Sequence, residues 1–93
     1  MDDPAFRARL EVHAKVALPT WGLLLPQIDD DTLRHDAERM VERLSRPDEP
    51  AEALARDEYD LTQRLITHGG WARSELRWIQ ELNSGAAMVI QGG

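Results

Sequence analysis

Apolar residues recur at every third or fourth position through four stretches of this chain, and this spacing constrains the fold more than any other feature. Residues that favour strands are scarce and never alternate over a useful length. The sequence therefore predicts an all-α fold, a small bundle of about four helices with short connectors. The apolar positions of the four stretches are Phe6, Leu10, Ala14 and Ala17; Leu33, Ala37, Met40, Val41 and Leu44; Leu54, Leu61 and Leu65; Leu76, Ile79 and Leu82.

Capping residues and helix breakers bound these stretches. Asp3 followed by Pro4 is typical of a helix start, because Asp caps the helix and Pro fits its first position. Proline inside a helix and glycine after one predict helix ends. The segments that we expect to separate the helices are Pro19, Asp29–Asp31, Pro47–Pro50, Gly69–Gly70 and Asn83–Gly85.

Two apolar segments lie outside the predicted helices. Residues 21–26 read Trp-Gly-Leu-Leu-Leu-Pro, and residues 86–90 form an apolar tail, Ala-Ala-Met-Val-Ile. Three consecutive leucines in a connector must pack on this core or on a partner. We expect both segments to contribute an interface. Trp21, Trp71 and Trp78 fit either core packing or an interface.

Length and charge exclude several classes of function. The 93 residues allow one helical domain, residues 1–93, whose core is small because so short a chain buries only about 60–65% of its unfolded surface. The 17 acidic and 11 basic residues give a net charge of −6, which argues against a nucleic-acid partner. No apolar stretch is long enough to span a membrane, and the acidic start favours a cytoplasmic protein.

Few residues form a recognisable catalytic or metal-binding pattern. The chain has no cysteine, and the spacing of His13, His35 and His68 matches no metal-ligand motif, so we assign no metal ligand here. We expect the carboxylates of Asp57–Asp60 to lie on a solvated face and His68 to end a helix. Gly92–Gly93 is interpreted as a frayed end.

Two stretches of the chain are nonetheless distinctive when taken together. Residues 6–11 read Phe-Arg-Ala-Arg-Leu-Glu, and residues 32–40 read Thr-Leu-Arg-His-Asp-Ala-Glu-Arg-Met. A later helix ends in His68-Gly69-Gly70 and is followed by Ser74-Glu75-Leu76. Over roughly residues 5–85 this pattern resembles the N-terminal helical domain of the nitrile hydratase β subunit. The helix that carries Arg34 is the most specific part of the resemblance.

The resemblance implies a role in hydrating nitriles to amides. In that family the α subunit holds Co(III) or Fe(III) through cysteines, two of which are oxidised to sulfenic and sulfinic acids. Arginines of the β subunit donate hydrogen bonds to the oxidised sulfurs, and Arg34 matches one of these by position. Leu33 would fall near the substrate channel. The resemblance thus implies no cofactor in this chain and an α-subunit partner that carries the metal, so this chain is not catalytic alone.

This sequence also departs from the family pattern. Lys15 stands where the family has a tyrosine, and the start of the third helix lacks the family's tyrosines. The likeness ends before the C-terminal β-barrel, so we expect a third chain to supply that domain and its arginine. Two alternatives stay open: an accessory protein that assists metal insertion into the α subunit, or an unrelated helical adaptor.

Overall fold

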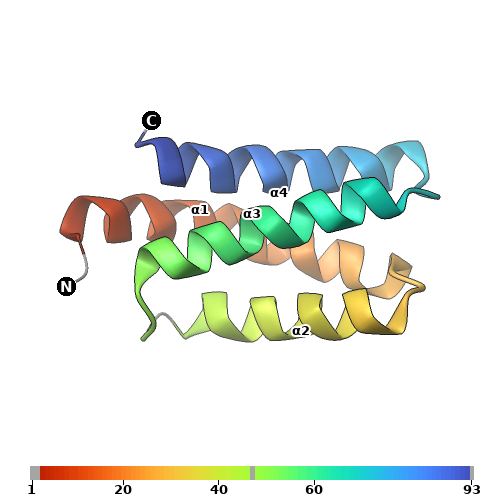
Figure 1. Ribbon diagram of the computed structural model, residues 1–93, viewed down its shortest axis with the longest axis horizontal. Helices are drawn as coiled ribbons and strands as arrows, with labels where there is room; N and C mark the ends of the chain where they lie inside the picture. The colour runs from red at the N-terminus through yellow and green to blue at the C-terminus, as the bar shows by residue number, and fades with distance from the viewer. Residues whose placement is uncertain (1–2, 47, 93) are drawn as a thin grey trace.

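The computed structural model describes residues 3–46 and 48–92, which form a bundle of four α-helices (Figure 1). These residues contain no β-strand, so the predicted all-α fold is confirmed. The elements are α1 (Pro4–Leu24), the short 3₁₀ helix η1 (Leu25–Gln27), α2 (Asp31–Ser45), α3 (Ala51–His68) and α4 (Arg73–Gln91).

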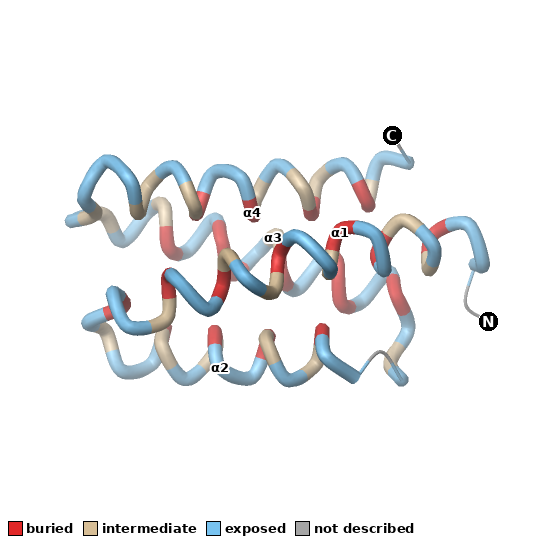
Figure 2. The backbone as a smooth tube through the Cα atoms, turned by 180° about the vertical axis from the view of Figure 1, so that it is seen from behind, coloured by how far each residue is buried: buried red, intermediate tan, exposed pale blue. Residues whose placement is uncertain are grey.

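Consecutive helices run antiparallel, and α1 contacts each of the other three (Figure 1). The inward faces of all four helices supply one hydrophobic core (Figure 2). Trp21 and Leu24 of α1, Leu54 and Leu65 of α3 and Ile79 of α4 are completely buried in it. Burying a side chain of this size stabilises the fold by about 1.5–3 kcal/mol.

The predicted helix starts and the third helix end are confirmed. The Asp3 carboxylate accepts a hydrogen bond from the Ala5 amide at 2.9 Å, and Asp30 caps α2 through the Leu33 amide, also at 2.9 Å. Gly69 and Gly70 follow α3 with φ of 73° and 79°, a conformation that glycine adopts without a steric penalty. Pro47, part of the predicted break between α2 and α3, lies outside the described residues.

The predicted end of the first helix at Pro19 is wrong, because α1 continues through it to Leu24. Proline removes one backbone hydrogen bond from a helix interior. Beyond Pro19, however, Trp21 and Leu24 continue the buried stripe of α1, and both are completely buried. The apolar area that they remove from water outweighs the lost hydrogen bond.

The predicted end of the fourth helix at Asn83–Gly85 is also wrong, since α4 extends to Gln91. The apolar segment 86–90 is therefore part of a helix rather than a tail. Ala86 and Val89 continue the buried stripe of Ile79 and Leu82, and a glycine inside a helix costs only about 1 kcal/mol. None of the helices in the described part of the chain is long and apolar enough to cross a membrane.

Candidate functional site

Arg34 lies in the first turn of α2, where its guanidinium is held by two acceptors. Its Nη2 donates to Asp31 Oδ1 at 2.6 Å, and its Nη1 donates to the Ile28 carbonyl at 3.2 Å. The side chain is 43% exposed and that of Asp31 is 89% exposed, so solvent screens this ion pair. A guanidinium has five N–H donors, so three remain for a partner. Arg34 is thus a partly oriented donor at the surface.

Leu33 precedes Arg34 and points into the protein. It is only 8% exposed and belongs to the hydrophobic core. It therefore presents little surface to a substrate channel, and its assignment to one stays a prediction.

The apolar segments expected to form an interface are partly internal, and Leu23 and Met88 in them are 55% and 61% exposed. Trp21, Leu24 and Ala86 are completely buried, and Val89 is only 3% exposed. Trp21 is thus a core residue, whereas Trp71 and Trp78 are half-buried. The exposed apolar surface belongs instead mainly to the outer face of α1.

This outer face, the α1 stripe, has a regular helical spacing that the sequence interpretation missed. Its residues recur at intervals of three or four, and all of them are exposed. Val12 is 68% exposed, Val16 67% and Leu23 55%. The members of the stripe are Ala5, Ala8, Val12, Val16, Pro19 and Leu23. A helix with apolar residues on two sides is typical of one that contacts more than its own core.

A buried polar cluster joins α1 to α3. The Glu58 carboxylate is completely buried; its Oε1 lies 2.8 Å from His13 Nε2, and its Oε2 accepts a hydrogen bond from Trp21 Nε1 at 2.9 Å. One turn along α3, the Thr62 hydroxyl accepts a hydrogen bond from the Asn83 amide of α4 at 2.9 Å. Each oxygen of the Glu58 carboxylate therefore has a partner, as a buried charge requires.

The expectation that residues 57–60 all lie on a solvated face is thus wrong for Glu58. The signal was present in the sequence. Leu54, Glu58, Leu61 and Leu65 recur at helical spacing, which places the glutamate on the buried stripe of α3. Likewise His13 lies on the buried stripe of α1, between Leu10 and Ala17.

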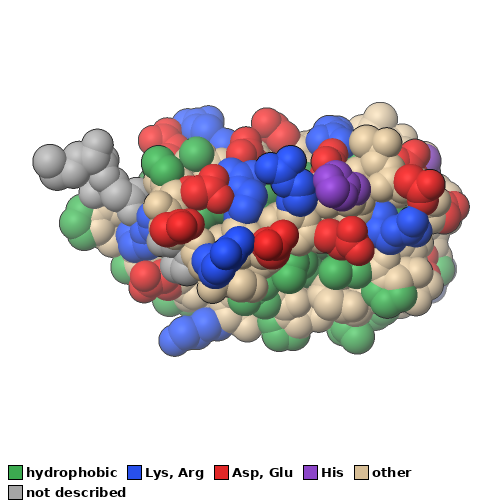
Figure 3. All heavy atoms as spheres, turned by 90° about the horizontal axis from the view of Figure 1, so that it is seen from below, with side chains coloured by type: hydrophobic (Ala, Val, Ile, Leu, Met, Phe, Trp, Pro, Cys, Tyr) green, Lys and Arg blue, Asp and Glu red, His purple; other side chains and the backbone are tan. Residues whose placement is uncertain are grey.

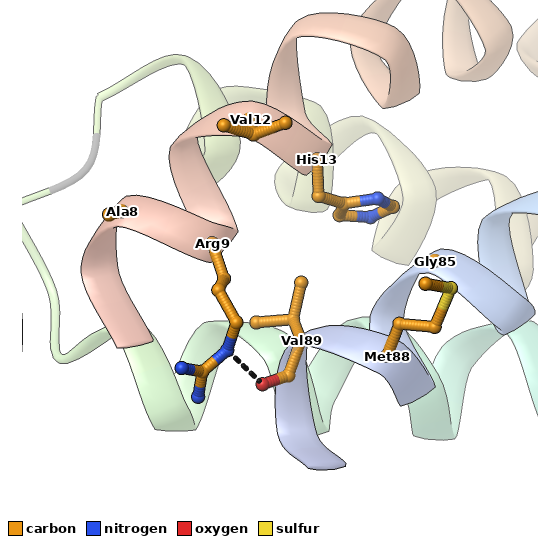
Figure 4. Close-up of a pocket in the computed structure, with 7 residues that line it drawn as sticks. All are labelled: Ala8, Arg9, Val12, His13, Gly85, Met88 and Val89. Atoms are coloured by element: carbon orange, nitrogen blue, oxygen red, sulfur yellow. Dashed lines mark hydrogen bonds between the residues drawn. The ribbon is translucent and has the colours of Figure 1, made fainter. Parts of the chain in front are cut away.

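The His13 ring packs directly over Gly85 of α4. A Cβ atom at position 85 would lie 2.4 Å from His13 Cε1 and 2.5 Å from Nδ1, so only glycine leaves room for the ring. Beside this contact, α1 and α4 enclose an open hollow of about 450 Å³ (Figure 4). Its lining is almost entirely apolar, and its residues are Ala8, Arg9, Val12, His13, Gly85, Met88 and Val89.

The second ring nitrogen of His13, Nδ1, lies next to Gly85 at the edge of this hollow. Only Nε2 of the ring makes a hydrogen bond within the described residues. Every fully buried side-chain nitrogen or oxygen in that part of the chain does have a hydrogen-bond partner. His13 Nδ1 is therefore not fully enclosed, although the residue as a whole is only 8% exposed.

A separate network of charges holds the connection between α2 and α3. Arg43 donates from Nε and Nη2 to both oxygens of Glu49, at 2.9–3.1 Å, and from Nη2 to Asp57 at 2.8 Å. The hydrogen bond from Arg43 lowers the pKa of Glu49, and the Glu49 carboxylate in turn raises the pKa of Arg43. Acidic and basic side chains alternate across this face (Figure 3). This pattern is typical of a solvated surface network.

The other histidines lie apart from His13. His68 is the last residue of α3, as expected, and lies 3.7 Å from Asp29; His35 is exposed on α2. Within residues 3–46 and 48–92, no group of three or more His, Asp or Glu side chains is arranged to hold a metal ion. Of Gly92–Gly93, Gly92 caps α4 with a φ of 85°, and Gly93 lies outside the described residues.

Comparison with models of protein families, with curated proteins and with solved structures found no match for this chain. Its chemistry therefore rests on the residues themselves. Two sites stand out: the oriented guanidinium of Arg34 on α2, which is suited to an anionic or strongly polar acceptor, and the hollow between α1 and α4, with an imidazole at its floor.

Proposed function

We propose that this chain is a small β-type subunit of a nitrile-hydratase-like metalloenzyme, in which it covers the metal-bearing α subunit. The observation that carries the proposal is the position of Arg34, the residue that the family resemblance singles out. It lies in the first turn of α2, is 43% exposed and is held by Asp31 and by the Ile28 carbonyl. Its remaining donors are free to bind oxidised cysteines of a partner.

The chemistry of guanidinium explains why an arginine would serve here. Sulfenate and sulfinate oxygens are small anionic acceptors, and a planar guanidinium reaches two of them at once with charge-assisted hydrogen bonds. Lysine offers one point charge and lacks this fixed geometry. The anchoring of Arg34 by Asp31 reduces the side-chain entropy lost on binding.

The α1 stripe supports a role as a subunit. Six exposed apolar residues follow one another along a helix of 21 residues, which is about 30 Å long. An apolar surface of this kind is typical of a protein that packs against another chain. In this proposal the partners are the α subunit, which supplies Co(III) or Fe(III), and a third chain with a β-barrel; the substrate is a nitrile.

Isolation of the native complex through this chain tests the proposal. We expect a stable assembly with a cysteine-rich chain that contains one Co or Fe and hydrates nitriles. A cysteine-rich chain that is bound only before it acquires metal would instead identify an assembly protein. Recovery of the chain without any metal-bearing protein would refute both roles and leave a helical adaptor.

Substitution of Arg34 tests its role within the assembled complex. We expect Arg34→Ala and Arg34→Lys to leave the helical content unchanged and to lower nitrile hydration at least about tenfold, since a charge-assisted hydrogen bond contributes about 1.5–3 kcal/mol. Arg46→Ala is the matched control, because Arg46 caps the C-terminal end of the same helix, is 74% exposed and forms a similar ion pair with Glu42. Equal activity of the Arg34 and Arg46 variants would overturn the assignment.

A further inference from the structure

We infer that the hollow between α1 and α4 is a binding site for a small apolar carboxylic acid. This inference is independent of the proposed function, because it uses no residue of the Arg34 site and requires no partner chain. It rests on three features of the hollow: its apolar walls, a histidine nitrogen that makes no hydrogen bond within the described residues, and the positive charge of Arg9.

The walls of the hollow fit the hydrocarbon part of such a ligand. Ala8 and Val12 of α1 face Met88 and Val89 of α4 across a space of about 450 Å³ (Figure 4). This volume lies within the range of about 300–1,000 Å³ found for small-molecule sites. Val12 and Met88 are 68% and 61% exposed without a ligand, so a bound hydrocarbon would remove their apolar surface from water.

The floor of the hollow is the His13 imidazole, a hydrogen-bonding group whose orientation is fixed by its neighbours. Glu58 fixes the His13 ring through Nε2, and Trp21 fixes Glu58 in turn. Gly85 allows the ring to sit against α4, with Cε1 and Nδ1 next to the glycine at the edge of the hollow. A neutral imidazole would accept a hydrogen bond from a carboxylic acid through Nδ1, and an imidazolium would donate one to a carboxylate. Both protonation states of the ring thus suit the same ligand class.

The charged side chains around the hollow favour an acidic ligand. The chain carries a net charge of −6, yet the hollow is lined by no carboxylate, and its only charged lining residue is Arg9. Arg9 donates through Nε to the Val89 carbonyl at 3.2 Å and lies over the Phe6 ring, 5.0 Å from its centroid. Its Nη groups make no hydrogen bond within the described residues. Arg9 and His13 both line the hollow (Figure 4). His13 is already bonded to the Glu58 carboxylate, so Arg9 is the group with which a ligand carboxylate would pair.

A nuclear magnetic resonance titration of the whole chain tests the inference, with sodium octanoate as the probe and octanamide as its neutral analogue. We expect saturable shifts at the amides of Val12, Gly85, Met88 and Val89 with octanoate, and binding of octanamide that is about tenfold weaker, since it forms no charge-assisted hydrogen bond. Shifts that never saturate, or equal affinity for the two probes, would overturn the inference.

One pair of variants distinguishes a defined site from a surface that binds apolar molecules without selectivity. Val12→Asp places a charge inside the hollow, whereas Val16→Asp places it one turn along the same helix, at a position that is equally exposed but outside the hollow. We expect the first to abolish octanoate binding and the second to change it less than about twofold. Equal losses would show that the α1 stripe binds apolar molecules without selectivity.

Arg9→Gln tests the contribution of charge. We expect it to weaken octanoate binding about tenfold while leaving octanamide binding unchanged, because only the carboxylate pairs with the guanidinium. Loss of binding of both probes, with the circular dichroism spectrum intact, would contradict a role for Arg9 in recognising the acid.

Discussion

Replacing Glu58 by alanine removes the group on which the junction of α1 and α3 depends. The carboxylate is completely buried and bonds His13 Nε2 at 2.8 Å and Trp21 Nε1 at 2.9 Å. After the substitution both nitrogens lose the oxygens to which they bond in the interior. A cavity of carboxylate size is left as well.

The loss of stability can be worked out from these contacts. A buried donor left without a partner costs about 1–3 kcal/mol, so two such donors cost about 2–6 kcal/mol. The middle of this range, about 3–5 kcal/mol, is the expected loss. A domain of this length has a total free energy of unfolding of about 5–14 kcal/mol. Glu58→Ala is therefore expected to remove a large part of the stability.

Urea denaturation followed by circular dichroism at 222 nm measures this effect. With a denaturant slope of about 1.3 kcal/mol/M, a loss of 3–5 kcal/mol lowers the midpoint by about 2–4 M. Glu58→Gln should cost only about 1–2 kcal/mol, because the amide oxygen still accepts one hydrogen bond and the imidazole can change its tautomer. Glu52→Ala, on the exposed side of the same helix, should cost less than about 0.5 kcal/mol. If Glu58→Ala destabilised the protein by less than about 1 kcal/mol, the buried cluster would not hold α1 to α3.

Two further stability measurements follow from the packing and the charges. Gly85→Ala should destabilise the protein by about 1–2 kcal/mol, because the new methyl group would overlap the His13 ring. Gly22→Ala on α1 should stabilise it by about 0.5–1 kcal/mol, since nothing lies within 4 Å of the added methyl group. If both variants changed the free energy of unfolding in the same direction in urea denaturation, this account would be contradicted. Because Arg43 lowers the pKa of Glu49 below its ordinary value of 4.5, the stability from this pair is present above pH 4.5 and is lost as the pH falls through the folded-state pKa. Between pH 6 and pH 3, Glu49→Gln should therefore lose less free energy of unfolding than the unsubstituted protein, as measured by thermal unfolding. The difference should be less than about 1 kcal/mol, because the pair is partly exposed. An unchanged pH dependence would refute the role of Glu49.

Local chemistry was enough to predict where most helices begin. Asp3 and Asp30 cap α1 and α2 through side-chain hydrogen bonds that depend only on neighbours in the sequence. Gly69 ends α3 because its backbone conformation is one that other residues rarely adopt. In contrast, the ends of α1 and α4 could not be predicted from Pro19 and Gly85. At both positions a local penalty, about 3 kcal/mol for the proline and about 1 kcal/mol for the glycine, is outweighed by apolar burial that involves distant segments.

The candidate sites also divide into one that local sequence predicts and one that depends on the tertiary structure. Arg34 was identified from the sequence, and its bond to Asp31 lies within one turn of one helix. The hollow between α1 and α4 was not foreseen, because its walls are separated by more than 70 residues along the chain. His13 and Glu58 each occupy an apolar stripe that the sequence displays, but their pairing joins two helices.

The sequence by itself determined the helical class, the caps and the alternation of charges on the solvent-exposed sides of the helices, because these depend on residues within about one turn of each other. Only the tertiary structure decided that α1 and α4 pass through their breakers, that Glu58 is buried against His13 and Trp21, and that an apolar stripe is left uncovered. These features depend on which helix faces meet. That choice is made by the area that the whole bundle removes from water, which no local pattern specifies.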